Sequence, residues 1–269
     1  VAVPAKKLAE IVKALSKGEV TLQASGEKLT ITCGKSRFVI NGRSADDFPK
    51  IPKQQTETSF SIDPDTLTGL ISKTIYAVST DLTRPALCGV LWEITRKGIS
   101  MVSTDGHRLA KVELAREIED VESTKAIIPP KALSTLKAYA ENEEEIQISI
   151  GENSISFDMT DTSIYSRLLE GPFPNYEKVI PEKNDKELVV SKDSLANATK
   201  RVSILSDSLT HQVVFSAKEN TLTLHVSTQE LGEAKEEISA NFSAEPMGGD
   251  AFHTKRLRKE TRTWRSSGS

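Results

Sequence analysis

The segment Val102–Ala110, which reads Val-Ser-Thr-Asp-Gly-His-Arg-Leu-Ala, contains an apolar strand end, a turn pair and the start of a second apolar strand. Asp105 and Gly106 both tolerate the positive φ angles that tight turns require. Apolar residues lie on both sides of this pair, at Met101-Val102 and at Leu109-Ala110. The segment therefore predicts two strands joined by a tight turn.

The side chains of this turn have three possible roles. Carboxylate and imidazole are common acid–base and metal-binding groups, so Thr104, Asp105 and His107 are candidates for a catalytic or metal cluster. No second His or Cys lies nearby at ligand spacing, and the sequence has neither a nucleophile elbow nor a glycine-rich phosphate loop. The two alternatives are a polar turn, with His107 hydrogen-bonded or solvated, and the rim of a binding site.

The length of 269 residues is sufficient for two or more domains. The fractions of hydrophobic residues, 37%, and of charged residues, 27%, indicate a soluble globular protein. Cys33 and Cys88 match no zinc or redox spacing, so we expect a reducing compartment and no disulfide. The sequence contains no run of 18 apolar residues, and Val1–Pro4 resembles neither a signal peptide nor a transit peptide. We therefore expect a cytoplasmic protein without a membrane segment.

The charge is unevenly distributed along the chain. The whole chain has a net charge of −3, whereas residues 248–269 contain six Lys or Arg against Asp250 and Glu260, a local charge of +4. Residues 1–247 therefore have a net charge of −7. An acidic body repels nucleic acid unless its basic groups are gathered on one surface. The aromatic content of 5% also argues against a single-strand binder that stacks bases.

Helices and strands alternate in a regular order. Leu8, Ile11, Val12 and Leu15 have the spacing of an amphipathic helix, which we expect to end near Ser16. A second helix is predicted from the Asp63-Pro64 N-cap through Val78, and a third opens at 127–131 and reaches Ala140. Strands are predicted at 20–24, 29–33, 37–40, 88–94, 99–103, 109–114, 146–150, 154–159 and 164–169.

The sequence repeats with a period near 125 residues. Val3–Leu8 matches Ile128–Leu133 at an offset of 125, and Phe48-Pro49 matches Phe173-Pro174 at the same offset. Val102-Ser103-Thr104 matches Val226-Ser227-Thr228 at an offset of 124. This period is too long for a solenoid, so it indicates duplicated domains. Each domain is itself doubled, because one helix and three strands occur twice within a period.

This phasing predicts four parts of the chain. Residues 1–56 are the second half of a first domain, 57–182 a complete second domain, 183–242 the first half of a third, and 243–269 an atypical basic tail. We expect neither strand nor helix in the tail, which is either a nucleic-acid-binding segment or the product of a shifted reading frame. Incomplete outer domains would expose strand edges, so we expect aggregation or a monomeric state.

Basic residues recur on the predicted helices of every copy. A helix face that bears lysine is usually a solvated face, but repetition at equivalent positions makes it a candidate electropositive surface. The residues are Lys6, Lys13, Lys73, Lys131, Lys137, Lys192, Lys200 and Arg201.

Four stretches resemble one family, the bacterial sliding clamp, which is the β subunit of DNA polymerase III. They are Arg84–Leu91, Val102–Ala110, Gly171–Pro181 and Arg201–Ser206, and the resemblance extends over Val1–Phe242. It implies an α+β fold of duplicated DNA-clamp domains, with helices lining a central hole and antiparallel sheets on the outside. It also implies a homodimeric ring, of which this chain would be a subunit truncated at both ends.

The resemblance implies a DNA sliding clamp, a processivity factor that encircles duplex DNA and tethers the replicative polymerase. Its implied partners are duplex DNA without sequence preference, the polymerase III catalytic subunit, the clamp loader and other proteins with a clamp-binding motif. Weak phosphate contacts from the helix residues named above would suit sliding. No catalysis, cofactor, metal or membrane is implied. The alternatives are a hydrolase that uses Asp105 and His107, and a duplicated α+β interaction scaffold without a DNA role.

Two further sites follow from the resemblance. An apolar pocket for partner peptides would have aliphatic walls and a polar rim that includes Thr104, His107 and Arg108. The pocket residues would be Leu87, Thr104, Gly106, His107, Arg108, Leu109, Pro174, Lys178 and Val179. The dimer interface would include Lys35, Arg37, Phe38, Ile40, Ile204 and Leu205, although Phe38, Ile204 and Leu205 could equally be core residues.

Overall fold

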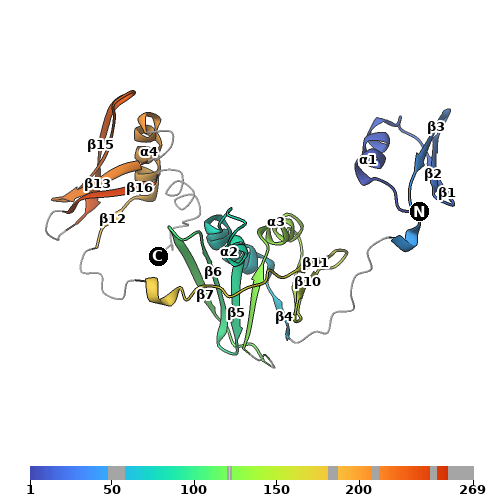
Figure 1. Cartoon of the computed structure of the whole chain (residues 1–269), viewed down its shortest axis with the longest axis horizontal. Coiled ribbons are helices and arrows are strands. Elements are labelled where there is room, and N and C mark those ends of the chain that lie inside the picture. Colours follow the sequence, from blue (N-terminus) through green and yellow to red (C-terminus); the bar gives the residue numbers. More distant parts are fainter. Residues whose placement is uncertain are drawn as a thin grey trace. The chain divides into compact units, whose positions relative to one another are not determined.

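Figure 1 shows the computed structural model of the chain, which forms two compact units, Val1–Lys53 and Gln54–Ser269. The structure describes residues 1–47, 58–119, 121, 123–180, 187–206 and 212–242, together with the backbone of 247–253.

The first unit contains one helix and one three-stranded antiparallel sheet. Helix α1 (Ala5–Ala14) precedes β1 (Val20–Ser25), β2 (Lys28–Cys33) and β3 (Ser36–Asn41), which lie in the order β1-β2-β3. The predicted helix and three strands are confirmed. Leu29, Ile31 and Cys33 of β2 are buried, whereas α1 buries no residue. The repeat partner Phe48-Pro49 lies outside the described residues.

The middle of the chain folds as two four-stranded antiparallel sheets. One has the order β7-β6-β5-β8, from β5 (Val90–Thr95), β6 (Gly98–Thr104), β7 (Leu109–Ala115) and β8 (Thr124–Ile128). The other has the order β11-β10-β9-β4, from β4 (Thr58–Ile62), β9 (Ile146–Ile150), β10 (Ser154–Asp158) and β11 (Ser163–Arg167). Strand β4 pairs with β9, and β8 pairs with β5. The first strand of each half therefore belongs to the sheet of the other half.

One core joins the two sheets with helices α2 (Pro64–Thr74) and α3 (Pro130–Tyr139). Figure 1 shows these helices next to each other above the strands of both sheets. Their buried residues, such as Leu67 and Leu133, belong to the same cluster as Trp92 and Phe157. The rings of Trp92 and Phe157 meet edge to face with centroids 6.0 Å apart. The second predicted domain is thus one body formed by two halves.

Helix α2 begins as predicted but ends earlier. The Asp63 carboxylate accepts a 2.7 Å hydrogen bond from Thr66 N, and this bond holds the pKa of Asp63 below its usual value. The α-helix stops at Thr74, and the 3₁₀ turn η2 (Ile75–Ala77) follows, so the predicted end at Val78 is wrong. The Thr74 hydroxyl donates to Leu70 O and Ile71 O, a local bond that competes with helix continuation.

Two strand predictions also need correction in this body. Cys88 is the last residue of a 3₁₀ helix, η3 (Pro85–Cys88), so β5 starts at Val90 and not at Cys88. Pro85 favours this turn because its fixed φ suits the first helical position. The short strands β4 and β8 were not predicted, since each is followed at once by a proline-led helix.

The last part of the chain forms a five-stranded sheet around its own core. Strand β12 (Val189–Val190) and helix α4 (Lys192–Val202) are followed by η5 (Ser203–Leu205). The sheet has the order β12-β15-β14-β13-β16, from β13 (Gln212–Lys218), β14 (Thr221–Thr228), β15 (Gly232–Asn241) and β16 (Met247–His253). Apolar residues of α4, including Leu195 and Val202, pack against the sheet.

Strand β16 contradicts the prediction that neither strand nor helix lies in the tail. It pairs with β13 from Gln212↔His253 to Ala217↔Met247, so the expected domain end at Phe242 comes too early for the sheet. The pairing of β16 with β13 repeats that of β8 with β5. The Gly-Gly sequence of this strand gives no alternating pattern from which it could have been predicted.

The duplication itself is confirmed by the positions of matched residues. Val102–Thr104 form the end of β6, and Val226–Thr228 form the end of β14, which are the second strands of equivalent halves. Within the described part of the chain, no helix has the length and apolar character needed to cross a membrane.

Candidate functional site

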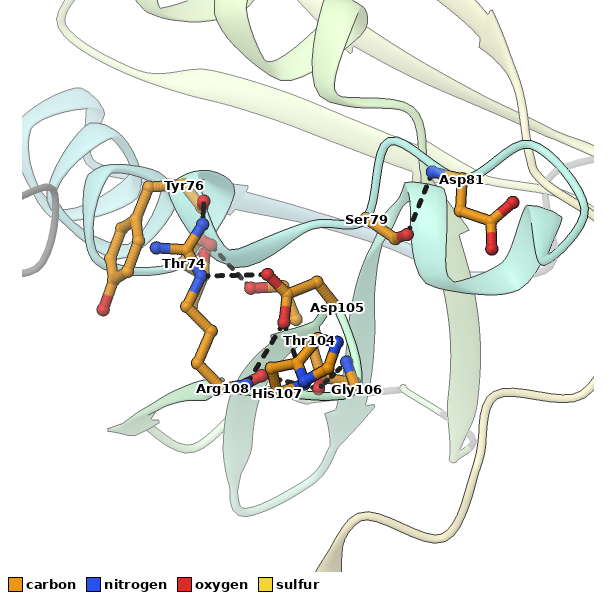
Figure 2. Close-up of polar contacts among 10 residues, drawn as sticks. Thr74, Tyr76, Ser79, Asp81, Thr104, Asp105, Gly106, His107 and Arg108 are labelled. Atoms are coloured by element: carbon orange, nitrogen blue, oxygen red, sulfur yellow. Dashed lines mark hydrogen bonds and ion pairs between the residues drawn. The ribbon is translucent and has the colours of Figure 1, made fainter. Parts of the chain in front are cut away.

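The predicted turn is the loop Asp105–Arg108 between β6 and β7, and its own side chains close it (Figure 2). Asp105 Oδ1 accepts hydrogen bonds from His107 N at 2.9 Å and from Arg108 N at 3.1 Å. Thr104 Oγ1 accepts one from Gly106 N at 3.1 Å and donates one to Arg108 O at 2.6 Å. Gly106 has a φ of 89°, which a residue with a side chain adopts only with strain. The loop is therefore held in one conformation.

Arg108 points inward from this loop toward the end of α2. Its Nε donates to Asp105 Oδ2 at 3.2 Å, and its Nη2 donates to Tyr76 O at 2.6 Å. The guanidinium also lies 5.4 Å from the centre of the Tyr76 ring. Figure 2 shows the two side chains next to each other. Only 12% of the side chain is exposed. The charge of Arg108 is therefore paired within the body, and its place at the rim of a pocket stays a prediction.

The same strand end also stabilises the C-terminus of helix α2. Ser103 Oγ donates a 2.6 Å hydrogen bond to Thr74 O, the carbonyl of the last α-helical residue. Arg108 Nη2 donates a hydrogen bond to Tyr76 O, a carbonyl two residues after Thr74. A cation near a helix C-terminus is favourable because the last carbonyls concentrate negative partial charge there. The turn and the helix thus form one polar structure.

We expect Arg108→Ala to lower the free energy of unfolding of the 58–180 body by about 2 kcal/mol, since hydrogen bonds to a partly buried charge are lost. Arg108→Lys keeps the charge but lacks the planar fork, so its effect should be intermediate. Urea denaturation followed by circular dichroism measures both variants. Equal stability of Arg108→Ala and the wild type would contradict this role.

Leu87, on the other side of the turn, lies in the 3₁₀ helix η3 and is buried. Its carbonyl accepts a 2.8 Å hydrogen bond from Ser79 N, and Ser79 Oγ accepts one from Asp81 N at 3.1 Å (Figure 2). Hydrogen bonds from Thr83 hold the pKa of Asp81 below its usual value. The loop that precedes η3 is therefore held by hydrogen bonds from its own side chains and backbone, like the turn at Asp105.

A small apolar cluster lies on the face of the β7-β6-β5-β8 sheet that the main core does not use. It contains Leu91, Val102, Ile127 and Tyr176, and Leu109 packs against it together with other partly buried residues. The chain after β11 crosses this sheet and supplies Tyr176 (Figure 1). Leu109 therefore packs against a cluster that includes a residue of the crossing segment, and the pocket with Pro174, Lys178 and Val179 stays a prediction.

Tyr176 is fixed in this cluster by Glu93. Its Oη donates a 2.5 Å hydrogen bond to Glu93 Oε2, and Lys125 Nζ lies 2.5 Å from Glu93 Oε1. Burial, the largest influence on Glu93, would raise its pKa, but hydrogen bonds from Lys125 and Tyr176 together outweigh it and lower the pKa. Burial and the Glu93 charge raise the pKa of Tyr176, so the phenol stays protonated. This pair anchors the crossing segment to β5.

The nine predicted pocket residues differ in accessibility. Leu87 and Thr104 are buried, while Arg108 and Leu109 are partly buried. The remaining five are exposed, and Val179, an apolar residue in the 3₁₀ helix η4 (Glu177–Val179), is 68% exposed. The exposed members are Gly106, His107, Pro174, Lys178 and Val179. A partner could reach the exposed five and the partly buried Leu109, whereas Leu87, Thr104 and Arg108 shape the surface from beneath.

The sequence did not single out Tyr76 or Tyr176, which position these groups. Tyr76 provides the carbonyl and ring that hold Arg108, and Tyr176 anchors the crossing segment through Glu93. Tyr176 belongs to the Phe-Pro-Asn-Tyr motif at 173–176, and a tyrosine whose ring is buried usually finds a hydrogen-bond partner for its hydroxyl, here Glu93. No local signal marks Tyr76, whose partner is distant in the sequence.

The predicted basic residues lie on all four α-helices. Lys192 is partly exposed and the other seven are exposed. In the middle body, Lys137 Nζ donates a 2.6 Å hydrogen bond to Ser72 Oγ, which places this amine beside the turn of α2 that contains Lys73. The amine of Lys137 on α3 thus contacts α2 at the residue that precedes Lys73.

Arg201 differs from the lysines because it is paired. Its guanidinium donates to both carboxylate oxygens of Glu236, and this contact raises the pKa of Arg201 and lowers that of Glu236. The charge of Arg201 is thus largely neutralised by β15. Among the predicted phosphate-facing residues, Arg201 is therefore a weaker candidate than the lysines.

The predicted dimer residues separate into exposed and packed groups. Phe38 on the edge strand β3 is 37% exposed and Ile204 is 76% exposed, so neither is a core residue of its own unit. Leu205, in contrast, packs against the core around α4. Lys35 and Arg37 are exposed on or beside β3, and Ile40 is partly buried.

Nothing in the described residues favours a catalytic or metal centre at the turn. The Asp105 carboxylate is occupied by the loop and by Arg108. No group of three or more His, Cys, Asp or Glu residues able to hold a metal occurs in the part of the chain that the structure describes. Cys33 and Cys88 are free thiols.

Comparison with known proteins gives consistent matches along the chain. Models of the DNA polymerase III beta subunit match its N-terminal domain at residues 1–52, its central domain at 61–175 and its C-terminal domain at 177–250. The beta sliding clamp of Staphylococcus aureus is 34% identical over 245 residues, 90% of this chain and 64% of that protein. The beta sliding clamp of Chlamydia pneumoniae is 30% identical over 246 residues, 91% of this chain and 67% of that protein.

Solved structures agree with these matches. The DNA polymerase III subunit beta of Pseudomonas aeruginosa superposes with a TM-score of 0.91 at 28% identity, over 97% of this chain and 72% of that one. The sliding clamp of Bacillus subtilis gives a TM-score of 0.91 at 28% identity, over 98% and 71%. The chain therefore spans 64–72% of the length of the proteins named here.

The doubled α+β halves, with paired helices packed on antiparallel sheets, define a clamp-type fold. Together with the three domain matches, this fold shows that the chain belongs to the family of the DNA polymerase III beta subunit, the bacterial sliding clamp.

Proposed function

We propose that this protein acts as a DNA sliding clamp, a processivity factor that encircles duplex DNA and tethers the replicative polymerase. The observation that carries the proposal is membership of the sliding clamp family together with a basic residue on every α-helix. Helices with lysine suit contact with phosphates of any sequence, since such contacts are electrostatic and contain no base readout.

Three domains are proposed on the basis of the family and the repeat: 1–56, 57–182 and a third that starts near 183 and includes β16. Ring closure as a homodimer would use the edge strand β3, with Arg37 and Phe38, and the exposed Ile204 of η5. Pairing of edge strands across subunits is physically favourable because β3 has unpaired backbone groups on its outer side.

Partner proteins would bind at the turn between β6 and β7. The proposed pocket joins the exposed His107 and the partly buried Leu109 to Val179 of the crossing segment, and takes a short linear peptide. The candidate partners are the polymerase III catalytic subunit, the clamp loader and other proteins with a clamp-binding motif. The rigid loop supports this role, because a preorganised surface loses less entropy when a peptide binds.

The proposed role is non-catalytic, requires no cofactor and is performed in the cytoplasm. The hydrolase alternative would need Asp105 as a free carboxylate, but this group is engaged by Arg108 and by two backbone N–H groups. Under the clamp proposal, His107→Ala changes peptide affinity and abolishes no turnover.

DNA binding by the lysine-bearing helices distinguishes a clamp from a scaffold without a DNA role. Binding of a fluorescent duplex to the chain, measured by anisotropy between 25 and about 150 mM salt, should weaken steeply with salt. Lys73→Ala with Lys137→Ala should lower the slope of log K against log salt by about 2, one unit for each lost phosphate contact.

The matched control removes the same charge elsewhere. Arg96→Ala with Lys97→Ala changes two exposed residues of the β5–β6 turn and should leave the slope unchanged. An identical decrease in both double variants would indicate non-specific charge attraction, and no duplex binding by the folded chain would favour the scaffold.

A further inference from the structure

A cavity of about 620 Å³ lies beside the apolar cluster of Leu91, Val102, Ile127 and Tyr176. Its walls come from β5 and β8, the turn between β9 and β10, and the crossing segment 168–177. Of the nine predicted pocket residues, only Pro174 lines it. Its volume is in the range of small-ligand and peptide side-chain sites. Nothing described above assigns a role to this space.

The inner wall of the cavity is apolar. Of its apolar lining residues, Leu91 and Ile127 are buried, and Phe173 and Leu168 are partly buried. Pro172 forms part of the exposed edge. An apolar side chain that enters this space removes hydrophobic surface from water on both sides, at about 25 cal/mol for each Å².

The rim of the cavity is acidic. Four glutamates and one lysine line it, and Glu93 is paired with Lys125. The remaining three carboxylates, on Glu152, Glu170 and Glu177, are exposed. In the described part of the chain, none of these three accepts a side-chain hydrogen bond or forms an ion pair. The rim therefore favours a cationic ligand and repels nucleic acid.

One side of the cavity is formed by an edge strand, β8. Strand β8 is the last strand of its sheet, and Leu169 N donates a 2.8 Å hydrogen bond to Ile127 O on the outer edge. Backbone groups alternate in direction along an edge strand, so those of Lys125 face the same side as those of Ile127. Lys125 also lines the cavity. An extended peptide can therefore continue the edge pairing that Leu169 begins.

We propose that this cavity is a second partner-binding site, which takes an extended peptide segment in which Lys or Arg alternates with Leu or Phe. The apolar side chains fill the space above Leu91 and Ile127, while the cations pair with Glu152, Glu170 and Glu177. Period-two alternation fits because successive side chains of an extended segment point to opposite sides. The site goes beyond the proposed clamp function and is independent of the pocket at the β6–β7 turn.

The test uses the full chain and a fluorescein-labelled peptide, Lys-Phe-Lys-Leu-Lys, in anisotropy titrations at about 50 mM salt. Glu152→Lys with Glu170→Lys should weaken binding about tenfold, because two attractive pairs at the rim become repulsive. The control, Glu141→Lys with Glu145→Lys, makes the same charge change at exposed residues outside the cavity and should alter affinity less than twofold. The peptide Glu-Phe-Glu-Leu-Glu should not bind.

Competition separates this site from the turn pocket. An excess of an unlabelled Gln-Leu-x-Leu-Phe peptide should leave binding of the cationic peptide unchanged. Displacement would place the cationic peptide in the turn pocket and overturn the proposal. Equal weakening in the two double variants, or no binding by the folded wild-type chain, would also overturn it.

Discussion

Leu109→Asp is expected to weaken binding of a Gln-Leu-x-Leu-Phe peptide at least tenfold, which corresponds to about 1.4 kcal/mol. Leu109 packs against the cluster of Leu91, Val102, Ile127 and Tyr176, and in the proposed pocket it would form the apolar wall nearest the turn. A carboxylate at this position would lose its hydration when the peptide's leucine or phenylalanine is seated against it. Fluorescence anisotropy of the labelled peptide with the full chain measures the effect.

The matched control for this variant is Leu82→Asp. Leu82 is 83% exposed and belongs to none of the described apolar clusters, so its replacement should leave peptide affinity within about twofold. Circular dichroism spectra of both variants show whether the fold is retained. Undiminished affinity in a folded Leu109→Asp protein would mean that the pocket lies elsewhere.

Trp92→Ala is expected to cause the largest loss of stability, about 3–5 kcal/mol. Trp92 is fully buried, and its ring meets Phe157 from the second sheet edge to face at 69°. The cavity left by the indole would lie where the two halves of the body meet, so neither half can close it alone. Thermal unfolding followed by circular dichroism should show a midpoint lower by roughly 10–20 °C.

The control for this prediction is Tyr139→Ala, which removes an exposed aromatic ring from the end of α3. Its effect on the midpoint should be small, because little surface is buried there. A decrease below about 1 kcal/mol for Trp92→Ala would contradict the single shared core that joins β5 to β10.

The sequence predicted those features that depend on local pattern and on repetition. The Asp63-Pro64 start of α2 and the turn at Asp105 follow from residue chemistry, and both are present. The duplication follows from the match of Val102–Thr104 with Val226–Thr228, and the two segments occupy equivalent strand ends. These signals lie within a few residues of one another, or recur at a fixed offset.

Features that depend on distant pairing were missed. Strands β4 and β8 each pair with a strand of the opposite half. The residues of β4 pair with residues of β9 that lie 84 or more positions away in the sequence. The inward orientation of Arg108 depends on Tyr76 O, which belongs to a different element. Strand β16 has a Gly-Gly sequence without alternation, so only its pairing with β13 reveals it. The anchoring pair Tyr176–Glu93 likewise joins residues far apart in the chain.

The site therefore has two kinds of residue that the sequence could not separate. In the proposed pocket, His107, Leu109 and Val179 would contact the partner, while Arg108 and Thr104 hold the turn between β6 and β7. Their roles differ in what a variant should do: the first kind changes affinity, and the second changes stability first.

Amide chemical-shift mapping tests the location of the peptide site most directly. A Gln-Leu-x-Leu-Phe peptide would be titrated into the ¹⁵N-labelled full chain, and each backbone amide would be followed. The account predicts shifts concentrated at 104–109 and 176–180, with Gly106 and His107 among the largest and those at 152–153 unchanged. Shifts centred on 125–127 and 152–153, or spread evenly over the chain, would contradict it.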